Sequence, residues 1–455
     1  MFLLELYIMV KYYDIVIIGG SAGGLSCLIS SARLYKDKSK LVIKKEVETP
    51  IPCALPYIYG EIGTCKKNVI PNGMVEKMGA DLLFDEVEFI DKENKVLKLK
   101  NSEEVKYDKL VISTGSIPFK PPIKNIDSDG VFFIYKNVEI SDNLADKIKH
   151  SNNIVVVGGG YIGVEFSEQI KEISPEKNVT IIEGLNRCLA MTFDEEFSNE
   201  VEDKLRYVGI NIVKEKYVEE VIGSNGVERI KLNDGSFIDA DLVIVGVGAK
   251  ANSVLADKSG LKLSERGDLI VDRFQKTSDK HIFAAGDVCE SFSFFTHKPL
   301  SIKLASVATM QGRIVAENLF ENHFPSVGVI GVYSSKVHDK VYSGAGLTES
   351  NAKREGFGFV VGNVKVINRH PDSLSGAKEI TMKLIFNKKN KVLIGGQVSG
   401  PNEVGSIINQ IALAIENKMT AYDLLFLQPA THPKVSVSPI KFHLIAAAEN
   451  ALSKF

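Results

Sequence analysis

The chain has no excess of charge of either sign, because 55 lysines and arginines stand against 57 aspartates and glutamates, for a net charge of −2. Without a global electrostatic field, a protein has no general attraction for nucleic acid or for an anionic membrane surface. We therefore expect neither as a partner, and we expect ligands to be recognised at local sites. The 455 residues, of which 44% are hydrophobic, predict about three domains with ordinary buried cores.

Cysteine is also scarce, and its spacing resembles neither a disulfide framework nor a metal site. An odd number of cysteines, five in all, lie at positions 27, 53, 65, 188 and 289. The histidines and acids show no metal-ligand spacing, and H-E-x-x-H is absent. We predict no metal and a reducing, cytoplasmic location. The apolar opening segment, Met1–Val10, is too short to span a membrane and contains Glu5, so we expect neither a signal peptide nor an anchor.

A glycine-rich turn follows the first strand pattern of the chain. Asp14-Ile-Val-Ile-Ile leads into Gly-Gly-Ser-Ala-Gly-Gly, and a helix pattern continues from Ser26. Glycines let the backbone approach a pyrophosphate closely, and a helix N-terminus offers it free N–H groups. The turn predicts a nucleotide site, although a serine stands where the second fingerprint glycine usually is. Its predicted binding residues are Gly19, Ser21, Ala22, Gly23 and Gly24.

A second turn carries the complete G-x-G-x-x-G motif after another apolar strand pattern. The next strand pattern ends in Glu183, where a carboxylate accepts hydrogen bonds from ribose hydroxyls and repels a 2′-phosphate. NADH is therefore favoured over NADPH, although Arg187, four residues further on, acts against that preference. The predicted binding residues here are Gly158, Gly160, Tyr161, Ile162, Gly163 and Glu183.

The corresponding strand pattern of the first copy ends in Lys44-Lys45-Glu46, so its acid is displaced behind two lysines. We assign Glu46 to the ribose of the first dinucleotide, and a solvated charge cluster is the alternative interpretation. Three further strand patterns end in small-residue turns, and Asp287 in the last of them is placed to accept from a ribityl hydroxyl. The predicted binding residues of these turns are Thr114, Gly115, Gly246, Gly248, Gly286 and Asp287.

Cys53 lies in the run Pro-Ile-Pro-Cys-Ala-Leu-Pro-Tyr and has no neighbouring cysteine at the spacing of a redox motif. Its thiolate form is the nucleophile, and a helix N-terminus over Ala54–Tyr57 would lower its pKa. Its oxidised form would be a mixed disulfide, a persulfide or a sulfenic acid. The alternatives are a buried structural thiol and a pairing with Cys65, twelve residues further on.

With two glycine turns, the Thr114-Gly-Ser turn, the Gly286-Asp287 turn and Cys53 in this order, the chain resembles the FAD-dependent pyridine nucleotide-disulfide oxidoreductases over essentially its whole length. The resemblance implies an α/β fold with two Rossmann-like dinucleotide-binding domains and an α+β C-terminal dimerisation domain. It also implies a homodimer with FAD and NADH as cofactors. The implied boundaries are 12–118 and 241–322 for the two parts of the FAD domain, 119–240 for the NAD(H) domain and 323–455 for the dimerisation domain.

Within that family, the glutathione-reductase type has a Cys-x4-Cys pair that this sequence lacks. The chain is most similar to the single-cysteine branch, which includes NADH peroxidases, NADH oxidases, coenzyme A-disulfide reductases and persulfide or polysulfide reductases. Cys53-Ala-Leu-Pro-Tyr most resembles the coenzyme A-disulfide reductases. Ala22 stands where peroxidases and many oxidases have a histidine, and Pro52 and Ala430 replace an asparagine and a tyrosine of the coenzyme A-disulfide reductases. These departures leave the electron acceptor open.

The resemblance further implies roles for Tyr161 and His432. Tyr161 would cover the flavin until nicotinamide displaces it, and a packed aromatic at a helix start is the alternative. His432 would act as an acid or base near the flavin across a dimer interface. The glutamate that holds such a histidine in the glutathione-reductase type is Val437 here, and an unoriented histidine is a poorer proton shuttle. A surface or packing histidine is the alternative.

We predict that NADH reduces the flavin and that electrons then pass through Cys53 to a small disulfide, persulfide or polysulfide. One alternative is an NADH oxidase that reduces O2 at the flavin. Another, of a different class, is a flavoprotein with a binding or assembly role, which would require neither Cys53 nor an intact second glycine turn.

Overall fold

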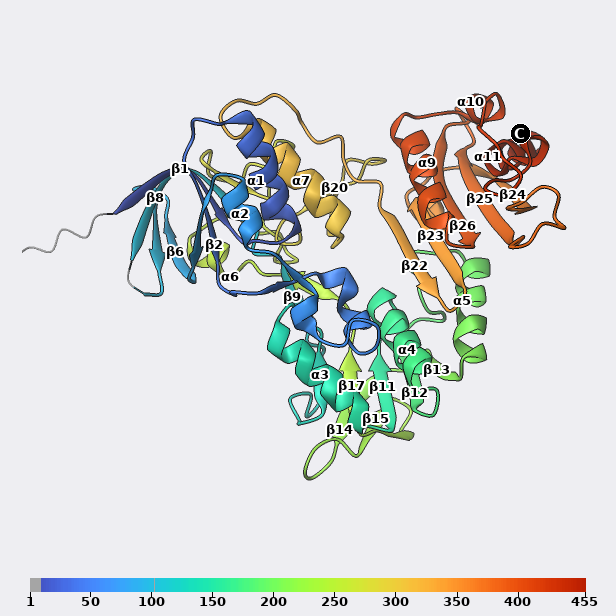
Figure 1. Cartoon of the computed structure of the whole chain (residues 1–455), viewed down its shortest axis with the longest axis horizontal. Coiled ribbons are helices and arrows are strands. Elements are labelled where there is room, and N and C mark those ends of the chain that lie inside the picture. Colours follow the sequence, from blue (N-terminus) through green and yellow to red (C-terminus); the bar gives the residue numbers. More distant parts are fainter. Residues whose placement is uncertain (1–9, 102) are drawn as a thin grey trace, which may run out of the picture. The chain divides into compact units, whose positions relative to one another are not determined.

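The computed structural model describes residues 10–101 and 103–455, and these form two compact units (Figure 1). The first unit contains the described residues up to Lys120 together with Tyr135–Ala145 and Gly248–Val329. The second contains Pro121–Ile134, Asp146–Val247 and Ile330–Phe455. Our prediction for the opening segment lies, up to Met9, outside the described residues. Within the described ranges, no helix is long and apolar enough to cross a membrane.

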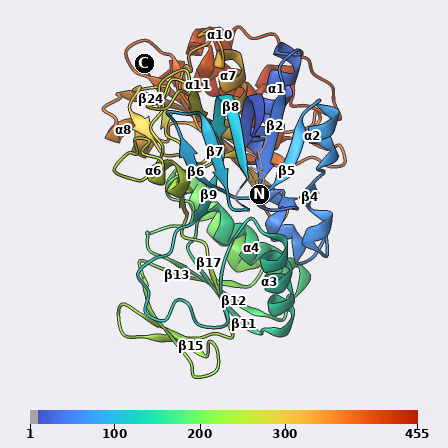
Figure 2. The same cartoon turned by 90° about the vertical axis from the view of Figure 1, so that its left-hand side faces the viewer.

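The first unit is built on a twisted sheet whose central strands are parallel, and Figure 2 shows β2, β5, β6, β7 and β8 of this sheet. A hairpin of two antiparallel strands, β6 and β7, extends it at one edge. In spatial order the strands are β5 (Asp81–Phe84), β2 (Lys40–Lys44), β1 (Lys11–Ile18), β8 (Glu104–Ile112), β7 (Val96–Leu99) and β6 (Val87–Asp91), with β19 (Ile282–Ala284) beside β8.

Both faces of this sheet are buried, as the apolar run of β1 indicates. Ile15 and Ile17 lie in one core, and Val16 and Ile18 lie in another, because successive side chains of a strand point to opposite faces. Two helices, α1 (Ala22–Leu34) and α7 (Ala305–Asn318), pack closely: a Cβ on Gly312 would lie 2.3 Å from the carbonyl oxygen of Gly23.

The remaining elements of the first unit are short and lie mostly in the connections. The helices are η1 (Pro52–Ile58), η2 (Cys65–Lys67), α2 (Gly73–Lys77) and α6 (Val254–Lys258). Three strand pairs accompany them: β3 (Thr49–Pro50) with β4 (Val69–Ile70), β9 (Ser116–Pro118) with β18 (Ala249–Ala251), and β20 (Ser291–Phe292) with β21 (Pro299–Leu300). Helix α3 (Val138–His150) contributes residues to both units.

The second unit contains a parallel five-stranded sheet that repeats the strand–turn–helix start of the first unit. Its strands are, in spatial order, β10 (Val131–Phe133), β17 (Leu242–Val245), β11 (Asn153–Val157), β12 (Asn178–Glu183) and β13 (Ile210–Lys214). Helices α4 (Tyr161–Ile173) and α5 (Glu195–Tyr207) belong to this part. A small antiparallel sheet shares its core and consists of β14 (Val218–Ile222), β15 (Arg229–Leu232) and β16 (Phe237–Asp239).

The C-terminal part of the second unit is an antiparallel sheet with helices. Its strands are, in spatial order, β22 (Val332–Val337), β23 (Lys340–Gly346), β26 (Leu393–Gly400), β25 (Glu379–Asn387) and β24 (Phe359–Ile367). The helices are α8 (Glu349–Arg354), α9 (Val404–Glu416), α10 (Ala421–Leu425), η3 (Pro439–Lys441) and α11 (His443–Leu452). Glycines allow close packing here, since a Cβ on Gly362 would lie 1.9 Å from the carbonyl oxygen of Ala447 in α11. The predicted α/β class, with two Rossmann-like sheets and an α+β C-terminal part, is confirmed.

Candidate active site

The first glycine turn connects β1 to α1 and has little room for side chains. Gly19 has φ +108°, and a Cβ there would lie 2.2 Å from the carbonyl oxygen of Ser113. A Cβ on Gly24 would lie 2.1 Å from the carbonyl oxygen of Gly19. The two glycines are therefore required by the packing of the turn itself. Ser21 precedes α1, and Ala22 is the first residue of this helix.

The second turn, between β11 and α4, has the same geometry and one additional feature. Gly158 has φ +106°, and a Cβ on Gly163 would lie 1.8 Å from the Gly158 carbonyl oxygen. At Gly160, by contrast, a Cβ would meet nothing within 4 Å in the described chain. Protein packing does not explain this glycine. Open space at the N-terminus of α4 fits the close approach of a ligand phosphate.

Glu183 ends β12 and lies against the second turn. Its carboxylate accepts hydrogen bonds from the backbone N–H of Gly159 at 2.6 Å and of Leu185 at 2.7 Å. An acid at this position suits ribose hydroxyls. Arg187 is near an acid of its own, because its guanidinium lies 3.6 Å from the Glu195 carboxylate in α5.

Tyr161 is the first residue of α4; the residue is partly buried, and its hydroxyl is buried near aromatic rings of the second unit. Its ring centroid lies 6.4 Å from that of Phe193 and 5.9 Å from that of Tyr333. Burial raises the pKa of the Tyr161 hydroxyl well above its ordinary value. Ile162 is partly exposed and lies beside the strand-end turn of β17, where a Cβ on Gly246 would be 3.2 Å from it.

The strand-end turn after β8 is held within the first unit by a reciprocal pair of contacts. The Thr114 hydroxyl donates to the Asn252 carbonyl oxygen at 2.7 Å, and the Asn252 N–H donates to the Gly115 carbonyl oxygen at 2.9 Å. Gly115 in this turn has φ +72°, and Gly248 in the turn after β17 has φ +108°. Both turns therefore use backbone conformations that favour glycine.

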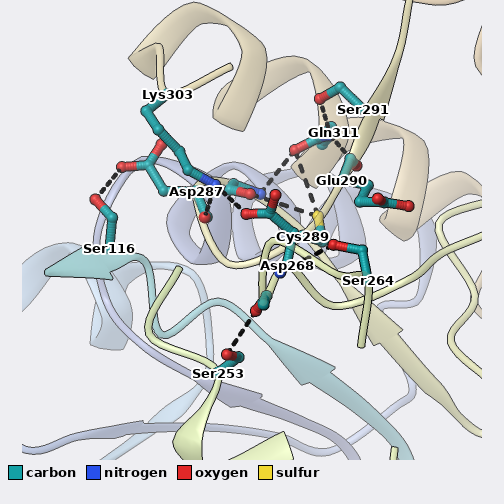
Figure 3. A network of polar contacts seen from close by, with 12 residues as sticks. Ser116, Ser253, Ser264, Asp268, Asp287, Cys289, Glu290, Ser291, Lys303 and Gln311 are labelled. Carbon is teal, nitrogen blue, oxygen red and sulfur yellow. Dashed lines mark hydrogen bonds and ion pairs between the residues drawn. The ribbon is translucent and has the colours of Figure 1, made fainter. Parts of the chain in front are cut away.

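Asp287 lies at the centre of a polar network in the first unit (Figure 3). Its carboxylate accepts from the Ser116 hydroxyl at 2.7 Å and from the Lys136 ammonium at 3.0 Å. Its carbonyl oxygen accepts from Lys303 at 2.6 Å. The preceding residue, Gly286, has φ +86° and donates its N–H to the Gln311 side chain at 2.8 Å. The aspartate is thus fixed on both its backbone and its side chain.

A buried ion pair is connected to the Gly286–Asp287 turn, because Lys303 donates to the Asp287 carbonyl oxygen. The Lys303 ammonium lies 2.6 Å from the Asp268 carboxylate (Figure 3). Both side chains are largely removed from solvent. Composition and motifs did not point to Lys303, Asp268 or Gln311, because none of them belongs to a local pattern. Only the folded chain brings them together behind the Gly286–Asp287 turn.

Cys53 is exposed, whereas the other four cysteines of the chain are buried. The alternative of a buried structural thiol is therefore excluded for it. Burial raises the pKa of Cys27, Cys188 and Cys289 to about 12 each, and it also raises that of Cys65. A thiol held protonated is a poor nucleophile. Among the cysteines, Cys53 thus carries the accessible thiol.

The segment that carries Cys53 differs from our expectation. It is a seven-residue 3₁₀ helix, η1, with Pro56 inside it, rather than an α-helix. Prolines remove backbone donors and favour such short turns. A strong α-helix dipole therefore does not support the thiolate. Cys65 lies in the next short helix, where its N–H donates to the Asp142 carboxylate at 2.6 Å.

His432 and Glu46 are both exposed. The His432 N–H donates to the Ser436 hydroxyl at 2.9 Å, and its ring Nδ1 accepts from the Lys434 N–H at 3.3 Å. The hydrogen bonds of His432 are thus local. Val437, which stands at the position of the orienting glutamate, is buried and cannot hold the ring by a hydrogen bond from its side chain. Glu46 accepts from the Asn137 amide at 3.5 Å. The described residues contain no cluster of three or more potential metal ligands.

Comparison with known proteins identifies the family of this chain. The model of the pyridine nucleotide-disulphide oxidoreductases matches residues 13–312, and that of their dimerisation domain matches residues 334–440. The chain belongs to this family.

Two curated relatives match over nearly the full chain. An NADH oxidase of Methanocaldococcus jannaschii is 31% identical over 96% of this chain and 98% of the relative. An NAD(P)H sulfur oxidoreductase (CoA-dependent) of Pyrococcus furiosus is 31% identical over 92% of this chain and 95% of the relative.

A solved structure is similarly close. The NAD-dependent persulfide reductase from A. fulgidus has a TM-score of 0.89 and 32% identity, covering 97% of this chain and 83% of that one. The predicted family is thereby confirmed, and with it an FAD-dependent pyridine nucleotide oxidoreductase with FAD and NADH as cofactors. The two glycine turns fit this requirement, because they repeat one geometry and so suit two dinucleotides.

Proposed function

We propose that this chain uses NADH to reduce a small disulfide, persulfide or polysulfide through the thiol of Cys53. The observation that carries the proposal is the distribution of the thiols, because one cysteine is exposed and four are buried. Cys53 is also placed, by sequence, in the single-cysteine motif discussed above. The relatives named as sulfur oxidoreductase and persulfide reductase support this acceptor class.

In this proposal each glycine turn binds a different cofactor. The first turn and the Asp287 turn would hold FAD, and the second turn would hold NADH, with Glu183 at the ribose. Bound FAD supplies hydride acceptance and onward electron transfer. The chain's own residues orient the reactants: Asp287 is fixed by Ser116 and Lys136 as an acceptor. The domain boundaries at 118, 240 and 322 belong to the same proposal.

Two residues take supporting roles. Tyr161 would screen the flavin from solvent until nicotinamide enters, which its place at the start of α4 beside the open Gly160 supports. His432 would move a proton near the flavin of a partner subunit. Its exposed ring has a nitrogen that accepts from Lys434, so the other ring nitrogen carries the proton when the imidazole is neutral.

We also propose a homodimer in a reducing cytoplasm. The match to a dimerisation domain over residues 334–440 supports the first part. The five cysteines form no disulfide with one another, which is compatible with the second.

An anaerobic titration with NADH tests the role of Cys53. A thiolate beside the oxidised flavin gives charge-transfer absorbance at long wavelength, so we expect this band in the wild type and in Cys65→Ser, and its loss in Cys53→Ser. If Cys53→Ser and the wild type give the same spectra, the thiol mechanism is wrong. Rates of NADH consumption with coenzyme A disulfide and with polysulfide then identify the acceptor.

The relative named NADH oxidase supports a second candidate function, reduction of O2 at the flavin. This activity does not require the thiol to be a nucleophile. It predicts that Cys53→Ser keeps its rate of NADH consumption under air while disulfide reduction is lost. Loss of both activities in the same variant would exclude oxidation at the flavin alone.

A further inference from the structure

The two glycine turns have the same hydrogen bond to the neighbouring strand. Gly19 donates its N–H to the Ile43 carbonyl oxygen at 2.9 Å, and Gly158 donates to the Ile182 carbonyl oxygen at 2.8 Å. The strand pairings on which these turns lie are parallel in both copies. The residue after each acceptor therefore occupies the same structural position. It is a lysine in the first copy and a glutamate in the second.

These two side chains, Lys44 and Glu183, also lie across their turns in the same way. A Cβ on Gly20 would be 2.5 Å from Cδ of Lys44, and a Cβ on Gly159 would be 2.9 Å from the carboxylate of Glu183. The second residue of each turn must accordingly be small. The position that carries the anion of Glu183 beside the second turn carries the cation of Lys44 beside the first turn.

Lys44 is buried, with 6% of its surface exposed, and its described partners are neutral. Its ammonium donates to the Asn72 side-chain oxygen at 2.6 Å and to the Val47 carbonyl oxygen at 3.4 Å. It also lies 5.7 Å from the ring centroid of Phe84. Among the described residues, no carboxylate lies within 4.0 Å of this ammonium. Burial accordingly lowers the pKa of Lys44. A buried charge of this kind calls for a counter-charge.

We propose that Lys44 binds the ADP half of FAD and that its counter-charge is the diphosphate. An ammonium has three donors, and the contacts above use two of them. The N-terminus of α1, which begins at Ala22, favours the same anion. The inference rests on the proposed assignment of the first turn to FAD. It makes Lys44 a cofactor-affinity residue at the place where an acid usually contacts ribose.

FAD binding to the full chain freed of flavin tests this role, measured by the change in flavin fluorescence at low and at high salt. We expect Lys44→Met to weaken FAD binding about tenfold at low salt. The salt dependence of binding should also decrease, because a charge contact to phosphate is removed. Lys45→Met is the matched control, since Lys45 is exposed and pairs with Glu86 at 2.9 Å. We expect it to bind FAD like the wild type.

Competition with ADP and with adenosine identifies the group that Lys44 contacts. ADP should displace FAD less effectively from Lys44→Met than from the wild type, whereas adenosine should show no difference. An equal loss for adenosine would overturn the assignment to the diphosphate. Equal FAD affinity and equal salt dependence in Lys44→Met and Lys45→Met would overturn the proposal as a whole.

A purely structural lysine would give a different result. Lys44→Met would then lower the melting temperature of the flavin-free chain without changing its FAD affinity. If Lys44→Met does not fold, Lys44→Arg and Lys44→Gln take its place: the arginine should bind FAD nearly as the wild type does, and the glutamine should not. Equal FAD affinity in these two would overturn the proposal. If the wild type itself binds no FAD, the proposed function fails, and not the assignment of Lys44 alone.

Discussion

The carboxylate of Glu183 accepts a hydrogen bond of 2.6 Å from the backbone N–H of Gly159, which anchors the end of β12 to the second glycine turn. A negative charge is thereby fixed at the position where we propose that the NADH ribose binds. A 2′-phosphate at this point would meet that charge directly.

Removal of this charge should therefore change the nucleotide preference. We expect Glu183→Gln to raise the KM for NADH about tenfold, because ribose hydroxyls lose a charged acceptor. The KM for NADPH should rise less or fall. Steady-state rates with both nucleotides check this, with Glu176→Gln, at an exposed position, as a control. An unchanged ratio of kcat/KM values would argue against a ribose contact.

Two glycines of the second turn should respond differently to alanine. Gly163→Ala puts a Cβ 1.8 Å from the Gly158 carbonyl oxygen, so it should destabilise the fold by about 2 kcal/mol or more. Gly160→Ala meets nothing of the described chain within 4 Å and has an ordinary φ of −76°. It should keep the melting temperature and weaken NADH binding. Thermal unfolding and NADH titration separate the two effects, and equal binding in Gly160→Ala and wild type would contradict the ligand site.

A buried lysine in the second unit should be important for stability. Lys383 has 3% of its side chain exposed and lies 2.9 Å from Asp194 and 2.6 Å from Glu196, and it also pairs with Glu349. Lys383→Met leaves the buried Asp194 without a cation and should cost about 3–5 kcal/mol.

An exposed ion pair supplies the matched control for this lysine. Lys365 pairs with Glu379 at 3.0 Å, and both side chains are largely exposed. Lys365→Met should change the stability of the protein little. Urea unfolding of both variants tests the contrast, and equal losses would mean that burial does not strengthen the Lys383 contacts.

His443 should make the protein sensitive to mild acid. Its ring is buried, neither ring nitrogen has a hydrogen-bond partner among the described residues, and burial lowers its pKa to about 4 from 6.5. The unfolded chain therefore binds the proton first, so this contribution to stability is complete above about pH 6.5 and is lost as pH falls towards 4. The full loss in the free energy of unfolding is about 3 kcal/mol.

His443→Phe removes this titration, and it keeps an aromatic ring beside Phe442, whose centroid lies 4.2 Å away. The difference in melting temperature between about pH 7 and about pH 5 should shrink in this variant. His150→Phe, at an exposed position, should retain the difference seen in the wild type. If acid lowers the melting temperature of all three proteins equally, His443 is not the group responsible.

Local patterns were sufficient to predict the two glycine turns and the acid at the end of β12. Their positive φ angles and close contacts require glycine, so the sequence carries a direct signal. The position of Glu46 shows the limit of this approach. An acid is expected near a dinucleotide ribose, but the residue equivalent to Glu183 is fixed by strand register, which places Lys44 there.

Long-range packing was beyond sequence patterns. Tyr161 contacts Tyr333, which lies far along the chain, and Lys303 meets Asp268 through the fold of the first unit. The helix expected after Cys53 is a 3₁₀ helix. Pro52 and Pro56 were a visible signal for this, because proline limits the backbone donors that an α-helix needs.

The separation of one exposed thiol from four buried thiols has a practical result. A native molecule treated briefly with an alkylating reagent should gain a single label at Cys53, and four more labels on unfolding. An added sulfur atom or a coenzyme A group that appears on the folded chain during turnover is then expected on this thiol, and alkylation of Cys53 beforehand should prevent the gain in mass. The sulfur adduct left by the last substrate would then be found on the sulfur atom of Cys53.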